Sequence, residues 1–169
     1  IYMKPYRKNG EYIIICLQPR KNWSMAGRDS AVWANNKIKE IRKYTDMPIH
    51  IRPHPSATNM TQEVINGKNI FKKEASLPFL EHVKNAWAVV TWNTTTSTDA
   101  LACGVPVWVE CKENHAWDVA NIDFSNIKKP ILYDRTDWFN KMCYRMWNYD
   151  ELKNGLVWKR MKKYIKENY

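Results

Sequence analysis

The chain has 169 residues, a net charge of +10 and 44% hydrophobic residues. The apolar content excludes a disordered chain, and the length suffices for one α/β domain with its own core. The positive charge favours an anionic ligand or surface, such as a nucleotide, a nucleic acid, an acidic polysaccharide or an anionic lipid, without choosing among them.

Apolar runs alternate with amphipathic stretches through the first part of the chain. β-Branched residues over 12–17 predict a buried strand, and the apolar run over 47–52 predicts a second one. The segment between them, 30–44, has the periodicity of a helix. Four apolar positions of that helix are expected to face the core: Val32, Trp33, Ile38 and Ile41.

The central part of the chain continues this alternation. We expect a minor strand over 69–71 and a buried strand over 87–91, separated by a helix over 78–86. His82 on that helix is expected to be exposed. The positions of the helix that are expected to point inward are Phe79, Leu80 and Val83.

The last part of the chain changes from mixed to helical. A polar stretch and a short helix lead to a strand over 105–109, and a marginal strand is expected over 131–132. From Asp134 onward the pattern is helical, with breaks near 148–150 and at 155. Strands that alternate with helices predict a single domain over 1–169, an α/β Rossmann-like fold with a doubly wound parallel sheet and a helical C-terminal tail.

Polar loops are expected at the carboxyl edge of this sheet, where doubly wound domains bind their ligands. Gln18 and Arg20 follow the first strand, and Arg52 and His54 follow the second. After the strand over 87–91, amide and hydroxyl side chains precede a helix, and they either cap that helix or bind a phosphate. These side chains belong to Asn93, Thr94, Thr95, Thr96 and Ser97.

Arg52 and His54 suit the binding of an anion. An arginine at a strand end can hold a phosphate through two hydrogen bonds. His54 lies between two prolines, whose restricted backbone fixes the imidazole at little entropic cost. We therefore interpret both residues as ligands of a phosphate oxygen or a leaving group. His115 follows the strand over 105–109 at the same edge, and a site role and an ordinary loop role both stay open for it.

Three segments resemble the donor-binding, C-terminal half of GT-B glycosyltransferases. They are Gln18-Pro19, His54-Pro55 and the segment NTTTSTDALACGVPV over 93–107. The chain is most similar to bacterial capsule and lipopolysaccharide enzymes that use CMP-activated sugars. These are β-Kdo transferases, with QP and HP motifs, and bacterial sialyltransferases, with an HP motif and a Ser/Thr motif. The likeness covers about 12–132, and the helical tail also suits the class.

This resemblance implies a metal-independent site, without a cofactor, for a CMP- or UDP-linked sugar. His54 would be catalytic, contacting the donor phosphate or helping the nucleotide to leave. Residues 94–97 would offer hydroxyl and N–H groups to that phosphate, and Gln18 would border the cleft. Asp99 stands where many of these enzymes have a glutamate that binds the ribose, although its shorter side chain reaches less far.

The resemblance also implies an acceptor-binding domain upstream, which commonly supplies the catalytic base. No residue of this chain presents itself as that base, so we expect the C-terminal half of a transferase that modifies a glycan or another acceptor. Two alternatives stay open. One is a phage-type glycosyltransferase that acts on nucleic acid. The other is a non-catalytic α/β domain that binds nucleotides or nucleic acid, or an epimerase-like domain.

Positive charge is concentrated in the C-terminal tail. It either forms a solvated helix face or contacts an anionic surface or a nucleic acid. Widely spaced cysteines and the lack of a membrane-spanning apolar run lead us to expect a cytoplasmic protein, free or peripheral at the inner membrane surface. The clustered cations of the tail are Lys159, Arg160, Lys162, Lys163 and Lys166.

Overall fold

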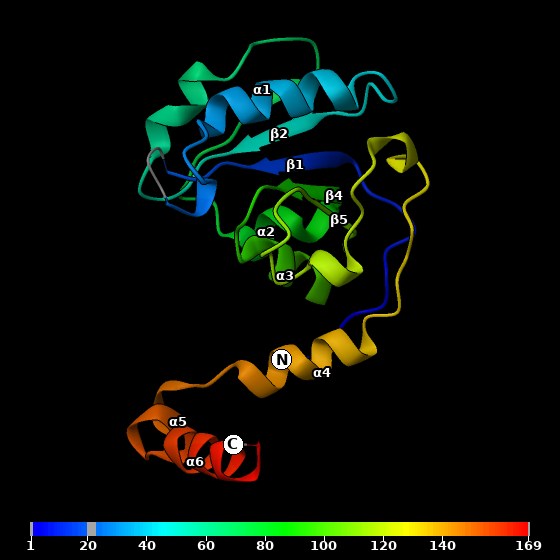
Figure 1. The fold of residues 1–169 in the computed structure, drawn as a ribbon. Coiled ribbons are helices and arrows are strands. Elements are labelled where there is room, and N and C mark those ends of the chain that lie inside the picture. The colour runs from blue at the N-terminus through cyan, green and yellow to red at the C-terminus, as the bar shows by residue number, and fades with distance from the viewer. Residues whose placement is uncertain (1, 20–22, 169) are drawn as a thin grey trace. The chain divides into compact units, whose positions relative to one another are not determined.

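The computed structural model describes residues 2–19 and 23–168 and consists of two compact units (Figure 1). The larger unit, Tyr2–Asp134, contains a parallel sheet with helices on both of its faces. The smaller unit begins at Arg135 and is helical. The sequence-based prediction of a sheet followed by a helical tail is therefore confirmed.

Five parallel strands form the sheet, in the order β3-β2-β1-β4-β5. They are β1 (Tyr12–Cys16), β2 (Ile49–Arg52), β3 (Ile70–Lys72), β4 (Ala86–Thr91) and β5 (Val107–Val109). The first strand of the chain lies in the centre, where Ile15 pairs with Ile51 on one side and with Val90 on the other. All four strand pairs are parallel, which confirms the predicted doubly wound arrangement.

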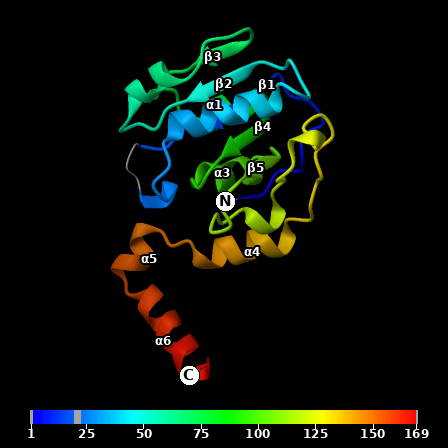
Figure 2. The same ribbon diagram turned by 45° about the horizontal axis from the view of Figure 1, so that its top comes forward.

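Helices cover both faces of the sheet, as Figures 1 and 2 show. They are α1 (Ser30–Ile41) on one face, and α2 (Phe79–His82) and α3 (Thr96–Ala102) on the other. Successive strand residues point to opposite faces. Ile49 and Ile51 of β2 therefore join the apolar core beneath α1, whereas His50 and Arg52 lie on the face of α2 and α3.

Several details of this unit differ from the sequence-based expectation. Val32 and Leu80 are each 58% exposed rather than packed, because the buried stripes of their helices run along other positions. His82, expected on the surface, is only 3% exposed. The helix expected over 78–86 is the short α2 followed by a 3-10 turn, and residues 131–132 form no strand in the described chain.

The turn between α3 and β5 explains the glycine of the segment DALACGVPV. Gly104 has a φ of +78°, which is costly for residues with a side chain. A Cβ at Gly104 would also lie 2.1 Å from the carbonyl oxygen of Pro5. The N-terminal segment is fixed to this turn, because the amide of Lys4 donates to Ala102 and that of Arg7 to Gly104, both at 2.9 Å.

The smaller unit contains α4 (Thr136–Arg145), α5 (Tyr149–Lys153) and α6 (Leu156–Asn168). Asn148 and Glu151 form a reciprocal capping box at the start of α5, and Gly155 separates α5 from α6 with a φ of +67°. The expected breaks near 148–150 and 155 are therefore confirmed. Within the described residues, no helix is long and apolar enough to cross a bilayer.

Candidate functional site

The carboxyl edge of the sheet contains a cavity of about 230 Å³. It lies at the ends of β1, β2 and β4, so the structure brings together loops that are far apart in the sequence. Arg52 and His54 contribute from one loop, and the threonine-rich segment contributes from another. The lining residues are Cys16, Leu17, Arg52, Pro53, His54, Pro55, Phe79, Thr94, Thr95 and Thr96.

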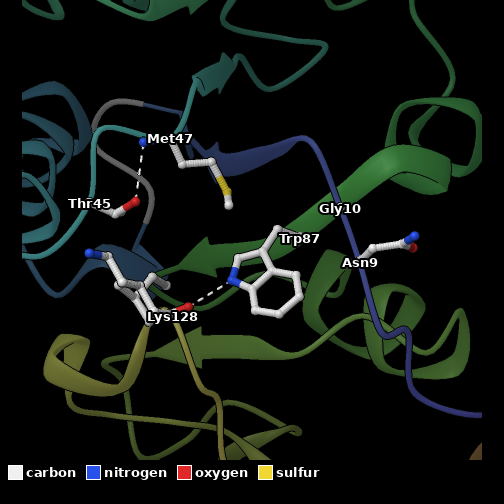
Figure 3. Close-up of a pocket in the computed structure, with 7 residues that line it drawn as sticks. Asn9, Gly10, Thr45, Met47, Trp87 and Lys128 are labelled. Carbon is white, nitrogen blue, oxygen red and sulfur yellow. Dashed lines mark hydrogen bonds between the residues drawn. The ribbon is translucent and has the colours of Figure 1, made fainter.

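A second cavity of about 230 Å³ lies at the opposite, amino edge (Figure 3). The indole of Trp87 forms part of its wall and donates a hydrogen bond to the carbonyl oxygen of Ile127 at 2.7 Å. Lys128 is the only cationic residue of its lining, which consists of Asn9, Gly10, Thr45, Met47, Trp87, Ile127 and Lys128. Three hydroxyls, a histidine and an arginine favour the carboxyl-edge cavity as the site for a polar anion.

Arg52 places a buried positive charge in the wall of this cavity. It is 7% exposed, yet among the described residues no carboxylate lies within ion-pair distance of it. Its guanidinium lies 5.5 Å from the centre of the Phe79 ring, and burial lowers its pKa. A buried cation without an acidic partner is costly, and an anion in the cavity would remove that cost.

Two histidines hold the inner side of Arg52. Nη1 of Arg52 lies 3.5 Å from Nδ1 of His82, and Nε2 of His82 lies 3.0 Å from Nδ1 of His50. An arginine only donates, so Nδ1 of His82 accepts and its Nε2–H donates to His50. This order requires both rings to be neutral. We refer to Arg52, His82 and His50 as the Arg-His-His chain.

The surroundings of this chain keep the imidazoles uncharged. Burial, followed by the charge of Lys73 and the neighbouring His82, lowers the pKa of His50 to about 4. Burial, followed by the charges of Arg52 and Lys73, lowers the pKa of His82 to about 4 as well. Tyr12 stacks on the His50 ring at 3.8 Å and donates its hydroxyl to the carbonyl oxygen of His82 at 2.7 Å. Near neutral pH the two neutral histidines of the Arg-His-His chain therefore hold the Arg52 side chain in position.

His54 is exposed at the mouth of the cavity. Its Nδ1 accepts from the backbone N–H of Ser56 at 3.2 Å and lies 2.8 Å from the Ser56 hydroxyl. A backbone amide can only donate, so the neutral ring carries its proton on Nε2. That N–H is the group that His54 can offer to a ligand.

The threonine-rich loop is stabilised by its own hydroxyls. The hydroxyl of Thr94 contacts that of Thr96 and accepts from the Thr96 amide at 3.0 Å. Thr95 is exposed at the start of α3. Thr94, Thr95 and Thr96 are the residues of this loop that line the cavity.

Ser97 and Gln18 lie beneath the site rather than in it. Ser97 is fully buried and its hydroxyl donates to the carbonyl oxygen of Thr94 at 2.8 Å, with Asn114 Oδ1 at 2.9 Å. The Gln18 amide accepts from the Asn93 backbone at 2.9 Å and donates to the Ser24 hydroxyl at 2.6 Å. Both side chains therefore hold loops in place, whereas the resemblance implies that Ser97 contacts the phosphate and that Gln18 borders the cleft.

The other predicted site residues that the structure describes do not line this cavity. Asp99 and His115 have exposed side chains, although the neighbouring atoms partly desolvate the Asp99 carboxyl group and so raise its pKa. Asn93 is half-buried and contributes its backbone N–H to Gln18. Arg20 lies outside the described residues. The sequence did not indicate that Phe79 and His82 belong to this site. The alternation of β2 shows which of its side chains face away from α1, but it does not show that α2, from a later part of the chain, covers that face.

KpsC from Thermosulfurimonas dismutans, a beta Kdo 2,4 transferase, has a similar solved structure, with a TM-score of 0.51 and 10% sequence identity. The fold resembles that of a glycosyltransferase. The comparison covers 64% of this chain and 37% of the KpsC chain, so this chain spans well under half of that structure. No family model and no curated protein matches the sequence. At this identity the likeness shows the fold alone.

Ser97 offers a test of the two roles that a hydroxyl can have in this loop. The change Ser97→Ala should lower the free energy of unfolding by about 1–3 kcal/mol, because it leaves the buried Asn114 amide without this partner. Nucleotide affinity should stay within about twofold, since the hydroxyl faces away from the cavity. Denaturant unfolding and calorimetric titration measure the two quantities. A variant that is as stable as the wild type but binds the nucleotide more weakly would show that Ser97 contacts the ligand.

Proposed function

We propose that the chain is the donor-binding domain of a metal-independent glycosyltransferase. The observation that carries this proposal is Arg52, a buried guanidinium without a carboxylate partner among the described residues, which lines the cavity at the carboxyl edge. The diphosphate or monophosphate of a CMP- or UDP-linked sugar would supply the missing negative charge. The glycosyltransferase-like fold and the convergence of hydroxyls on the same cavity support this choice over other anions.

The proposed site would act by stabilising the departing nucleotide. As the bond between the sugar and the phosphate breaks, negative charge builds up on the phosphate oxygen. Arg52 would offer two donors to that phosphate, and His54 would donate from Nε2 to the leaving oxygen. The hydroxyls of Thr95 and Thr96 would complete the contact. The positive charge of Arg52 and the hydrogen bond from His54 would take the place of a metal ion at the phosphate.

The acceptor side of the reaction would lie in another domain. The comparison covers 37% of the KpsC structure, and the described residues that line the cavity include no carboxylate that would act as a base. We propose that an upstream domain binds a glycan or another acceptor and provides the base. The isolated chain should therefore bind the donor without transferring the sugar.

Calorimetric titration with CMP, UDP and GDP tests the donor proposal, with inorganic phosphate as the reference anion. We expect one nucleotide to bind at least about tenfold more tightly than phosphate, because the loops should also contact the nucleoside. A crystal structure with that nucleotide should place its phosphate beside Arg52. Equal, weak binding of all four probes would contradict a nucleotide site.

The side chain of His54 should contribute to nucleotide affinity about as much as one hydrogen bond to a charged group does. The change His54→Ala should weaken affinity for the preferred nucleotide by about 10- to 100-fold, the equivalent of about 1.5–3 kcal/mol. Its effect on thermal stability should be small, since the side chain is exposed and its loop contact is with Ser56.

His115→Ala is the matched control for His54→Ala. It removes a second exposed histidine that does not line the cavity, so its affinity should equal that of the wild type. If His54→Ala binds as His115→Ala does, His54 does not contact the nucleotide.

One exposed residue favours a nucleic-acid acceptor as a second candidate. Trp23 is 90% exposed just beyond the loop that follows β1, and a base stacks readily on such a ring. A polynucleotide should then bind with steep salt dependence and lose affinity on Trp23→Ala without losing the nucleotide. If Trp23→Ala binds the polynucleotide as tightly as the wild type does, a glycan stays the preferred acceptor.

A further inference from the structure

The last helix of the chain has two distinct long sides. With 3.6 residues per turn, its apolar side chains after Leu156 fall on one stripe. No residue of this helix is buried, and the large apolar residues of the stripe are about half exposed or more. They are Trp158 at 63%, Met161 at 50%, Tyr164 at 56% and Ile165 at 47%.

The opposite side of α6 is cationic. Its lysines lie next to one another on the helix surface, and Glu167 is the only carboxylate of the helix. One lysine, Lys163, approaches Glu167 at 3.8 Å, which leaves most of the positive charge uncompensated. The lysines of this side are Lys159, Lys162, Lys163 and Lys166.

An open groove of about 840 Å³ continues the apolar stripe within the same unit. Side chains of α4 line it together with Met161, Tyr164 and Ile165 of α6. Arg160 lies over the rings of Tyr144 and Trp147, 5.0 and 4.6 Å from their centres. Cations and aromatic rings are therefore interleaved inside the groove, whereas along α6 itself the lysines and the apolar stripe lie on separate sides.

The segregation of charge from apolar surface identifies the partner. A single-stranded nucleic acid would contact cations and rings that are interleaved, and it would leave the stripe of Met161 and Ile165 in water. A protein partner on that stripe would leave the lysine side unmatched. An anionic bilayer satisfies both sides together, since acyl chains cover the stripe, phosphates meet the lysines and Trp158 sits at the interface between them.

We propose that α6 binds the surface of anionic phospholipid membranes. The helix lies in the plane of the headgroups with its apolar stripe facing the acyl chains, and it does not span the bilayer. All residues of this surface belong to the helical unit. The proposal therefore stands or falls independently of the donor site at the carboxyl edge of the sheet.

Flotation of the full chain with vesicles tests the proposal. Vesicles of phosphatidylcholine mixed with phosphatidylglycerol should carry the protein upward in a density gradient, and vesicles of phosphatidylcholine alone should not. The double variant Lys162→Glu/Lys166→Glu should weaken this binding by about a hundredfold or more. The double variant Met161→Ser/Ile165→Ser should weaken it by about tenfold or more, which separates insertion from attraction between charges.

Lys39→Glu/Lys43→Glu is the matched control, because it makes the same change in net charge at exposed positions in and just after α1. Its binding should stay close to that of the wild type, and circular dichroism should show unchanged helix content in all three variants. Equal losses in the two lysine pairs would reduce the effect to net charge and overturn the proposal. The proposal would also be overturned if the protein floated with neither kind of vesicle, or if the Met161→Ser/Ile165→Ser variant bound as tightly as the wild type.

Discussion

Replacing Arg52 with methionine should weaken nucleotide binding by about a hundredfold or more and leave the unliganded protein about as stable as the wild type. The loss follows from the removal of two charge-assisted hydrogen bonds, each of which contributes about 1.5–3 kcal/mol. The stability follows from burial, since Arg52 is 7% exposed and among the described residues has no carboxylate partner. Methionine fills a similar volume without a charge to desolvate.

Titration calorimetry and thermal unfolding, performed on the same samples, measure these two quantities. Arg52→Lys should give an intermediate affinity, because an ammonium keeps the charge but loses the planar fork. Lys43→Met is the control for the loss of one positive charge at an exposed position, and it should bind as the wild type does. An Arg52→Met protein that is several degrees less stable would mean that Arg52 has a structural role, and unchanged affinity would place the anion elsewhere.

Acidification should destabilise the larger unit between about pH 6.5 and pH 4, through the Arg-His-His chain. Unfolded histidines gain protons as the pH falls below about 6.5. In the folded protein His50 and His82 resist protonation until about pH 4. The unfolded state therefore binds more protons throughout this window, and the free energy of unfolding falls as the pH falls.

We expect this loss to be about 3 kcal/mol for the pair, roughly half of what the two shifts would contribute without solvent screening. Urea unfolding at a series of pH values measures it. The double variant His50→Phe/His82→Gln should flatten the pH dependence over this window, whereas His54→Ala should keep it, because His54 is exposed. A wild-type protein whose stability does not change between pH 6.5 and pH 4.5 would contradict the neutral state of both rings.

Much of the fold could be predicted from the sequence because local runs of apolar, β-branched residues indicate buried strands. The run over 12–17 consists of residues that a parallel sheet buries on both faces, and Gly104 marks a turn that needs a positive φ. The positions of Val32 and Leu80 could not be predicted in the same way. Apolar residues also occur on exposed helix faces, and only the packing of the whole domain decides which stripe is covered.

The candidate site was predictable as a place but not as a set of contacts. Topology alone brings the loops after β1, β2 and β4 to one edge, and the sequence indicated Arg52, His54 and the threonines there. The inward turn of Ser97 depends on Asn114, which comes from the loop after β5. The burial of His82 depends on a helix that covers β2 from a distant part of the chain. Neither contact has a local sequence signal.

The central position of β1 has a consequence for synthesis of the protein. This strand pairs with β2 and β4, which come later in the chain, so it emerges from the ribosome before either partner exists. Until β2 appears, the run Tyr12–Cys16 is an apolar, β-branched segment with both edges unpaired, and one edge stays open until β4 is made. Such segments are prone to aggregate. Nascent chains that end before Ala86 should therefore depend on chaperones more than the finished protein does.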